Sequence, residues 1–533
     1  SARMVPLLGG LKAMDLILSG RSIDGRTGKR MGLVDLVVPE RHLRAAARKL
    51  VLESPAPYQP GLLDRLSNNF LVRPLLARVF SQQVAKRAPR NHYPSPYAMI
   101  DIWQKHATDK RRMLDAEAQS LARLITGATA QNLVRVFFLQ EQLKSLGKDK
   151  SYQPRYVHVI GAGTMGGDIA AWCAFRAFHV SLQDQAPERI APAIKRAHSL
   201  FKRKLKRPVK ISEAMDRLMP DHKGIGVGRA DFVIEAIFED AEVKRSLYKD
   251  IEPGMKPDAL LATNTSSIPL EELSSALARP ERLVGLHFFN PVAMMQLVEV
   301  VRGQTTSPEV AARAMTFTRQ IDRLPLPVTS TPGFLVNRIL MPYLMEAVLL
   351  EAEGIPPVVI DKAATAFGMP MGPVQLADTV GLDICLHVAE ILAGHFNEEV
   401  PERLRKLVAE GHLGRKSGRG FYNYKKGKPV KEKAGSGNWN TDEVSNRLIG
   451  RLLNESVSCI REQVVENENL LDAGMIFGTG FAPFRGGPMH YIDAIGADVL
   501  NQQLQSLKKL RGERFTPDNG WNTLMQSSGG STA

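Results

Sequence analysis

A short apolar strand that runs straight into a glycine-rich turn constrains this chain most. Residues 156–160 read Tyr-Val-His-Val-Ile, and a G-x-G-x-x-G motif follows at Gly161, Gly163 and Gly166, before a helical pattern. In that context the first glycine permits a tight turn and the second lets the backbone approach a pyrophosphate. The third lets helix and strand pack closely, so that the helix N-terminus faces the phosphates. The segment predicts a dinucleotide site; a purely structural glycine turn is the alternative.

An acidic residue at the end of the next strand refines that prediction. Residues 179–183 form a second apolar strand, and Asp184 follows it, 23 positions after Gly161. A carboxylate at this offset accepts a hydrogen bond from the ribose 2′-hydroxyl and repels a 2′-phosphate. The sequence therefore predicts NAD, rather than NADP, as cofactor.

Strands and helices alternate over the middle of the chain. Residues 231–236 and 259–263 are further predicted strands, each followed by helical sequence. This alternation predicts a parallel doubly wound sheet, an α/β fold of the Rossmann type. The preceding residues read as helices, apart from a short apolar strand ending at Pro39. A polar linker over 147–154 is expected to close that part.

Beyond residue 332 the apolar spacing turns helical and its markers recur. Arg338, preceded by Asn and followed by Glu eight residues later, reappears as Arg447 with the same neighbours. We therefore predict two copies of one all-helical module, joined around residues 423–441 by a linker rich in Lys, Gly, Ser and Asn. The predicted division of the chain is 1–55, 56–154, 155–330, 331–430 and 441–533.

Two apolar strands around a proline-containing turn predict a hairpin over 283–301. His287 and Glu299 are each six residues from its tip near Ala293, so they should face each other across the hairpin. An imidazole held by a carboxylate has a fixed tautomer, as a general base near neutral pH needs. A buried histidine beside a structural glutamate is the other interpretation, and the spacing alone leaves both open.

Two more polar segments lie where they could line the same site. Asn264 and Ser266 follow a predicted sheet strand, at the carboxyl end where doubly wound folds bind ligands. The alternative for this segment is a helix N-cap ahead of Glu271 and Glu272. Asn337 opens the first helical module and could reach a cleft between domains; a packing amide is the alternative there.

Composition limits the class of protein. The 533 residues are 44% apolar and 23% charged, which indicates three or four globular domains. The three cysteines share no metal-type spacing, so a disulfide-stapled secreted protein is excluded and no metal is expected. No segment has the apolar length of a membrane-spanning helix. The net charge of +15 allows an anionic partner, but no nucleic-acid motif accompanies it and aromatic residues are only 6%.

In the glycine turn, the hairpin and the two polar segments described above, the chain resembles the L-3-hydroxyacyl-CoA dehydrogenase family. The resemblance lies in the order of four segments: 161–166, 264–267, 287–292 and 333–338. Residues 1–50 resemble the end of an enoyl-CoA hydratase (crotonase) domain. Together these parts are similar to the multifunctional alpha subunit of fatty-acid β-oxidation, which implies NAD-dependent oxidation of an L-3-hydroxyacyl-CoA.

The resemblance also implies roles for single residues. His287 is the expected base and Glu299 its partner, with Ser266 and Asn337 orienting the substrate hydroxyl. Residues expected near the bound cofactor, besides the glycines and Asp184, are Glu239, Lys244 and Asn264. Eight basic residues between 195 and 210 are read either as a solvated helix face or as the site of the CoA phosphates. Ser199 and Lys206 are the candidate contacts in that region, and Asn290 is a further candidate substrate contact.

Several expectations concern the wider protein. The chain is expected to be truncated within the crotonase domain, and therefore to lack the hydratase active site that its parent would carry. A thiolase partner is implied by the family alone. The second helical copy is expected to keep the chain monomeric, and a bacterial cytoplasm is the expected location, ahead of mitochondrion or peroxisome. A non-catalytic NAD- or nucleic-acid-binding scaffold remains the alternative function.

Overall fold

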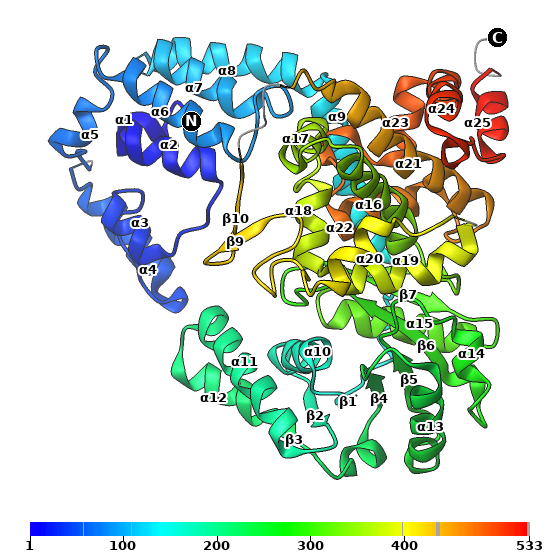
Figure 1. Ribbon diagram of the computed structural model, residues 1–533. Coiled ribbons are helices and arrows are strands. Elements are labelled where there is room, and N and C mark those ends of the chain that lie inside the picture. Colours follow the sequence, from blue (N-terminus) through cyan, green and yellow to red (C-terminus); the bar gives the residue numbers. More distant parts are fainter. Residues whose placement is uncertain (57, 108, 397, 433–436, 530–533) are drawn as a thin grey trace. The chain divides into compact units, whose positions relative to one another are not determined.

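A computed structural model describes residues 1–56, 58–107, 109–396, 398–432 and 437–529. Its contacts divide the chain into two compact units, Ser1–Val134 and Arg135–Ala533. Figure 1 shows the elements of both. In the part of the chain described, no helix is long and apolar enough to cross a membrane.

The Ser1–Val134 unit is helical. A small core around Trp103 joins its helices, with Val5, Leu8, Met14 and Ile100 among the buried residues. The strand expected to end at Pro39 is wrong: residues 34–39 form no strand, because no other strand lies among the described residues of this unit to pair with them. The helices are α1 (Met4–Leu8), α2 (Gly10–Ser19), α3 (Gly25–Met31), α4 (Leu43–Glu53), α5 (Leu62–Leu66), α6 (Arg73–Ala85), α7 (Ser95–His106) and α8 (Lys110–Ile125), and α9 (Ala128–Ser145) crosses the boundary.

The second unit is built on an eight-stranded sheet of order β3-β2-β1-β4-β5-β6-β7-β8. Strands β1 to β6 run parallel, and β7 and β8 run the other way. The parallel doubly wound sheet predicted from the sequence is therefore confirmed. The strands are β1 (Tyr156–Ile160), β2 (His179–Gln183), β3 (Leu218–Pro220), β4 (Phe232–Glu235), β5 (Leu260–Thr263), β6 (Leu283–Phe288), β7 (Leu297–Arg302) and β8 (Leu324–Thr329).

Two of these strands were not predicted. β3 has only three residues, too few to show an alternating pattern. β8 contains Pro325 and Pro327, which weaken a strand signal, but it lies at the edge of the sheet, where missing N–H donors are tolerated.

Alternate strand residues enter two different cores, one on each face of the sheet. Val157, Phe232 and Leu260 pack with α10, α11 and α15, whereas Val233 and Leu261 pack with α13 and α14. The flanking helices are α10 (Thr164–Phe175), α11 (Pro187–Leu205), α12 (Pro208–Asp216), α13 (Ala241–Ile251), α14 (Leu270–Ser274) and α15 (Pro308–Gln320). The basic run 195–210 does not lie on one helix, since α11 ends at Leu205 and Lys206 takes a left-handed backbone with φ 59°.

The helices after the sheet repeat in order. The first set is α16 (Val336–Ala352), α17 (Pro357–Phe367), α18 (Pro373–Val380) and α19 (Leu382–Phe396), followed by α20 (Glu402–Ala409). The second set is α21 (Thr441–Arg461), α22 (Glu468–Thr479), α23 (Pro488–Ile495) and α24 (Ala497–Arg511), followed by α25 (Gly520–Gly529). The expected linker contains a short hairpin, β9 (Asn423–Lys425) and β10 (Lys428–Val430); residues 433–436 of it lie outside the described residues.

Crossed ion pairs join the two copies. Arg338 Nε lies 2.7 Å from Glu455 Oε1, and Arg447 Nε lies 2.7 Å from Glu346 Oε1. Both arginines are 1% exposed. Each glutamate follows the arginine of its own copy by eight residues, but it pairs with the arginine of the other copy. This exchange is what a pseudo-twofold arrangement of α16 and α21 produces.

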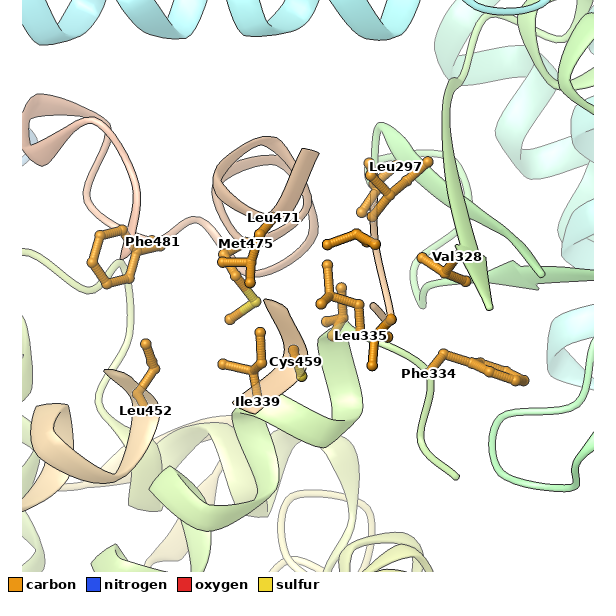
Figure 2. Packing of buried hydrophobic residues seen from close by; sticks show 14 of the residues in the cluster. Leu297, Val328, Phe334, Leu335, Ile339, Leu452, Cys459, Leu471, Met475 and Phe481 are labelled. Atoms are coloured by element: carbon orange, nitrogen blue, oxygen red, sulfur yellow. The ribbon is translucent and has the colours of Figure 1, made fainter. Parts of the chain in front are cut away.

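The second copy also completes the core behind the sheet. Figure 2 shows Leu297 and Val328 of the sheet, Leu335 and Ile339 of the first copy and Met475 of the second within one buried cluster. The first copy therefore lacks a solvent-exposed face at this point because the second one covers it.

We predict that deleting the residues after 440 makes the protein insoluble or self-associating. The deletion uncovers apolar helix faces and removes every carboxylate within ion-pair distance of Arg338 and every guanidinium within that distance of Glu346. Leaving a buried charge unpaired costs about 3–5 kcal/mol. Sedimentation velocity measures the outcome. A soluble, monomeric and fully active 1–440 fragment contradicts the prediction, as does an intact chain that dimerises through 331–533.

Candidate active site

The centre of the site is a pair of side chains that face each other across the β6–β7 hairpin. His287 and Glu299 are register partners, as their spacing predicts. His287 Nδ1 lies 2.6 Å from Glu299 Oε2. The glutamate is 0% exposed and the histidine 6%. A carboxylate at Nδ1 assigns the ring proton to that nitrogen, which leaves Nε2 with the free lone pair of a base.

The second oxygen of Glu299 is held by the first helical copy. Oε1 accepts the backbone N–H groups of Leu335 at 3.1 Å and Val336 at 2.9 Å, at the N-terminus of α16. These N–H groups have no partner within the helix, and the positive end of the helix dipole favours a negative charge there. The rings of Phe289 and Phe334 lie 4.6 and 5.6 Å from the imidazole. Glu299 is therefore fixed on both oxygens, beside an imidazole flanked by aromatic rings.

The loop after β5 contributes hydroxyl and amide groups. Its expected alternative, an N-cap for the following helix, is wrong: α14 has Pro269 at its N-cap position, with no side-chain cap. The loop is tied to Glu239 instead, whose Oε1 accepts the Thr265 hydroxyl and the Ser266 N–H, each at 2.7 Å. Asn337 Nδ2 donates to the Ser266 carbonyl at 3.4 Å, so two residues expected at the substrate hydroxyl lie together.

Asn264, at the start of this loop, reaches the hairpin. Its Oδ1 accepts the backbone N–H of Phe288 at 2.9 Å, next to His287 in the chain. The loop after β5, the end of β6 and the start of α16 thus belong to one hydrogen-bonded arrangement at the carboxyl edge of the parallel strands. Ligands of doubly wound folds bind at this edge.

The two charged residues expected at the cofactor, Glu239 and Lys244, form an ion pair with each other. Burial alone raises the pKa of Glu239, but the charge of Lys244 and the hydrogen bonds from Thr265 and Ser266 outweigh it and lower that pKa. Lys244 is 0% exposed, with Nζ 2.7 Å from Glu235 and 3.4 Å from Glu239. In the free protein the lysine is enclosed between two carboxylates.

Glu235 is the residue of this region that sequence reasoning missed. It is the last residue of β4 and is 0% exposed. One signal could have found it: an acidic residue that closes an apolar strand, Phe-Val-Ile-Glu, at the ligand-binding edge of the sheet.

The glycine turn has the shape that a pyrophosphate needs. Gly161 has φ 103°, and a Cβ there would come within 2.5 Å of the Ala236 carbonyl oxygen. A Cβ on Gly166 would overlap the carbonyl of Gly161, whereas none of the described atoms lies within 4 Å of a Cβ on Gly163. The open side at Gly163 and the uncapped N-terminus of α10 fit a dinucleotide phosphate. Asp184 Oδ2 accepts the Ala162 N–H at 2.8 Å, which places its carboxylate beside this turn.

The three candidate substrate contacts lie outside this hydrogen-bonded network. Ser199 donates to the Lys195 carbonyl of its own helix at 3.0 Å, and Lys206 is the C-cap residue that follows that helix. Asn290 is exposed in the connection between β6 and β7. The structure shows no hydrogen bond from these three side chains to His287, Glu299 or Ser266 among the described residues.

Among the described residues, no cluster of three or more His, Cys, Asp or Glu side chains could hold a metal ion. Cys173, Cys385 and Cys459 are buried and unbonded to one another.

Comparison with known proteins assigns this arrangement to a family. Residues 156–331 match the NAD binding domain of 3-hydroxyacyl-CoA dehydrogenase, and residues 333–424 match its C-terminal domain. The fatty acid oxidation complex subunit alpha of Shewanella baltica is 35% identical over 555 residues, covering 99% of this chain and 78% of that protein. The corresponding subunit of Shewanella amazonensis is also 35% identical, covering 97% of this chain and 76% of the relative.

Solved structures agree with these matches. The 3-hydroxybutyryl-CoA dehydrogenase of Escherichia coli K12 superposes with a TM-score of 0.63 at 27% identity, over 71% of this chain and 99% of its own. The dehydrogenase part of multifunctional enzyme 1 from C. elegans gives 0.54 at 26% identity, over 74% of this chain and 99% of its own. The resemblance to the 3-hydroxyacyl-CoA dehydrogenases and to the alpha subunit of fatty-acid β-oxidation is thereby confirmed. The chain belongs to the family of fatty acid oxidation complex alpha subunits, and it contains both domains of an NAD-dependent 3-hydroxyacyl-CoA dehydrogenase.

Proposed function

We propose that this chain oxidises an L-3-hydroxyacyl-CoA to the 3-ketoacyl-CoA with His287 as general base and Glu299 as its partner. The observation that carries the proposal is the 2.6 Å contact between His287 Nδ1 and Glu299 Oε2, at the ligand-binding edge of the sheet. Bound NAD supplies the acceptor for the hydride that leaves C3 of the substrate.

The proton steps belong to the chain. Nε2 of His287 takes the proton of the 3-hydroxyl as C3 is oxidised, and the ring becomes an imidazolium. Glu299 stabilises that cation, because its carboxylate stays bound to Nδ1–H and to the N–H groups of Leu335 and Val336. In the reverse direction His287 returns the proton to the carbonyl oxygen.

Ser266 and Asn337 orient the reacting hydroxyl. The Asn337 amide donates to the Ser266 carbonyl, and the Ser266 hydroxyl donates to Glu239 Oε1 at 3.3 Å, so the two residues are adjacent. For the cofactor, the turn containing Gly161, Gly163 and Gly166 would hold the pyrophosphate and Asp184 the ribose, with Asn264 and Glu239 nearer the reacting end. Lys244 would act there through Glu239, since it is enclosed.

The wider proposals rest on the family and on the fold. Ser199 and Lys206 would contact the CoA moiety, whose phosphates the basic residues of 195–210 would attract, and Asn290 would contact the substrate. The crossed arginine pairs support a monomer through the duplicated helical domain. A thiolase partner rests on the family resemblance alone, and a location in a bacterial cytoplasm is supported by the bacterial sources of the relatives.

One assay separates this proposal from a non-catalytic scaffold and from a hydratase. Purified protein is given 3-hydroxybutyryl-CoA and NAD at mildly alkaline pH, and absorbance is followed in the NADH band; a parallel sample receives the enoyl-CoA alone. NADH formation without hydration of the enoyl-CoA is the expected result.

We predict that His287→Gln lowers turnover by about 10²–10⁴, the range for loss of a general base. Folding and NAD affinity should change little, because the hairpin lies apart from the glycine turn. Steady-state kinetics and calorimetric titration with NAD measure both. His412→Gln is the matched control, since His412 also faces a carboxylate, Glu410 at 3.1 Å, but is 21% exposed and lies in the loop after α20. A His287 variant that binds NAD normally and keeps more than about a tenth of its turnover removes the histidine from the base role.

We predict that Asp184→Ala weakens NAD binding and narrows the preference for NAD over NADP. The substitution removes a ribose hydrogen bond and the repulsion of a 2′-phosphate together. Dissociation constants for both cofactors are the measurement, with Asp250→Ala, an exposed helical position on α13, as control. Unchanged constants for both cofactors place Asp184 outside the ribose site.

A further inference from the structure

Glu235 has every lone pair of its carboxylate engaged inside the protein. Oε1 accepts the Ile237 N–H at 2.8 Å and Lys244 Nζ at 2.7 Å. Oε2 accepts the hydroxyls of Tyr248 and Thr263, each at 2.8 Å. A buried carboxylate with four donors from three elements is held in one position, so it can in turn fix whatever its partners touch.

Lys244 links the fixed Glu235 carboxylate to Glu239. Its ammonium is shared between Glu235 at 2.7 Å and Glu239 at 3.4 Å, and the lysine has no exposed surface. Because two carboxylates compete for one cation, the position of Glu239 depends on how much of the lysine's charge Glu235 neutralises. Without the charge on Glu235, the lysine would draw Glu239 toward itself.

Glu239 in turn links Lys244 to the loop after β5. The same oxygen, Oε1, accepts the Thr265 hydroxyl and the N–H of Ser266, both at 2.7 Å, and the Ser267 N–H at 3.3 Å. The Ser266 carbonyl then receives Asn337. A continuous polar path therefore leads from Glu235 to both side chains that orient the substrate hydroxyl.

We propose that Glu235 is a positioning residue of the dehydrogenase: it fixes Lys244 so that Glu239 holds the Ser266 loop in its reactive position. The inference rests on the proposed roles of Ser266 and Asn337. A purely structural carboxylate is available for comparison at the other end of the same strand. Asp231 precedes β4 and accepts the N–H groups of Arg155 and Tyr156 and Lys256 Nζ at 2.6–3.0 Å, at the opposite edge of the sheet.

The test compares Glu235→Gln with Asp231→Asn, Lys244→Met and the Glu235→Gln/Lys244→Met double variant in the full chain. Amide hydrogen exchange over 264–268 is measured without ligands, and kcat and KM are measured with NAD and 3-hydroxybutyryl-CoA. Glu235→Gln should speed exchange at Ser266 and Ser267 at least about tenfold and lower kcat by about 10–100-fold, as displacement of a positioning group does. Asp231→Asn should lower the melting temperature and leave both readouts unchanged.

Non-additivity is the signature that a merely structural role would not give. Since Glu235 acts through Lys244, the double variant should lose no more kcat than Lys244→Met alone. Wild-type exchange rates and kcat in Glu235→Gln overturn the proposal, and so do losses that multiply in the double variant. If Glu235→Gln does not fold, Glu235→Asp replaces it, with the same order of effects expected and wild-type exchange again overturning the proposal. An inactive wild-type chain counts against the proposed function, whereas the exchange measurement, which needs no substrate, still decides the role of Glu235.

Discussion

The active site of this enzyme depends on the contacts that hold one buried carboxylate, that of Glu299. Its two oxygens join β7, which carries it, to β6 through His287 and to α16 through two backbone N–H groups. A carboxylate without exposed surface is tolerable only when its lone pairs are engaged. The hairpin and the helix N-terminus must therefore meet at a fixed distance, and this brings the α/β domain and the first helical copy together at the site.

The second helical copy supports that meeting from behind. α22 approaches closely because two of its residues are glycines: a Cβ at Gly474 would come within 2.7 Å of Leu335, and one at Gly478 within 3.0 Å of Val336. Leu335 and Val336 are the residues whose N–H groups hold Glu299. The repeat thus has a consequence for the chemistry as well as for solubility, since the covered face of α16 includes the turn that binds the carboxylate.

Much of this arrangement follows from the sequence, because its determinants are local. The glycine turn, the strand before it and the hairpin register depend on neighbouring residues, and spacing alone placed His287 opposite Glu299. The internal repeat that contains Arg338 and Arg447 is also visible in the sequence, whereas the crossed pairing of these arginines comes from the structure. The predictions that were wrong or missing depend on contacts between distant segments. The apolar residues before Pro39 resemble a strand, but no strand among the described residues of their unit pairs with them. β8 is recognisable only by its place at the sheet edge. Glu235 has a local signal at the end of its apolar strand, but its four donors, from Ile237 to Thr263, are brought together only by the fold.

A double-mutant cycle between His287 and Glu299 tests most directly whether the pair acts as a unit. The value of kcat/KM is measured for His287→Gln, Glu299→Gln and the double variant, with NAD affinity checked in each. If Glu299 works by holding the imidazole and stabilising its cation, Glu299→Gln alone lowers kcat/KM by about 10²-fold or more, and the double variant loses no more than His287→Gln. Losses that multiply in the double variant would show that the two residues act independently, and would contradict the account.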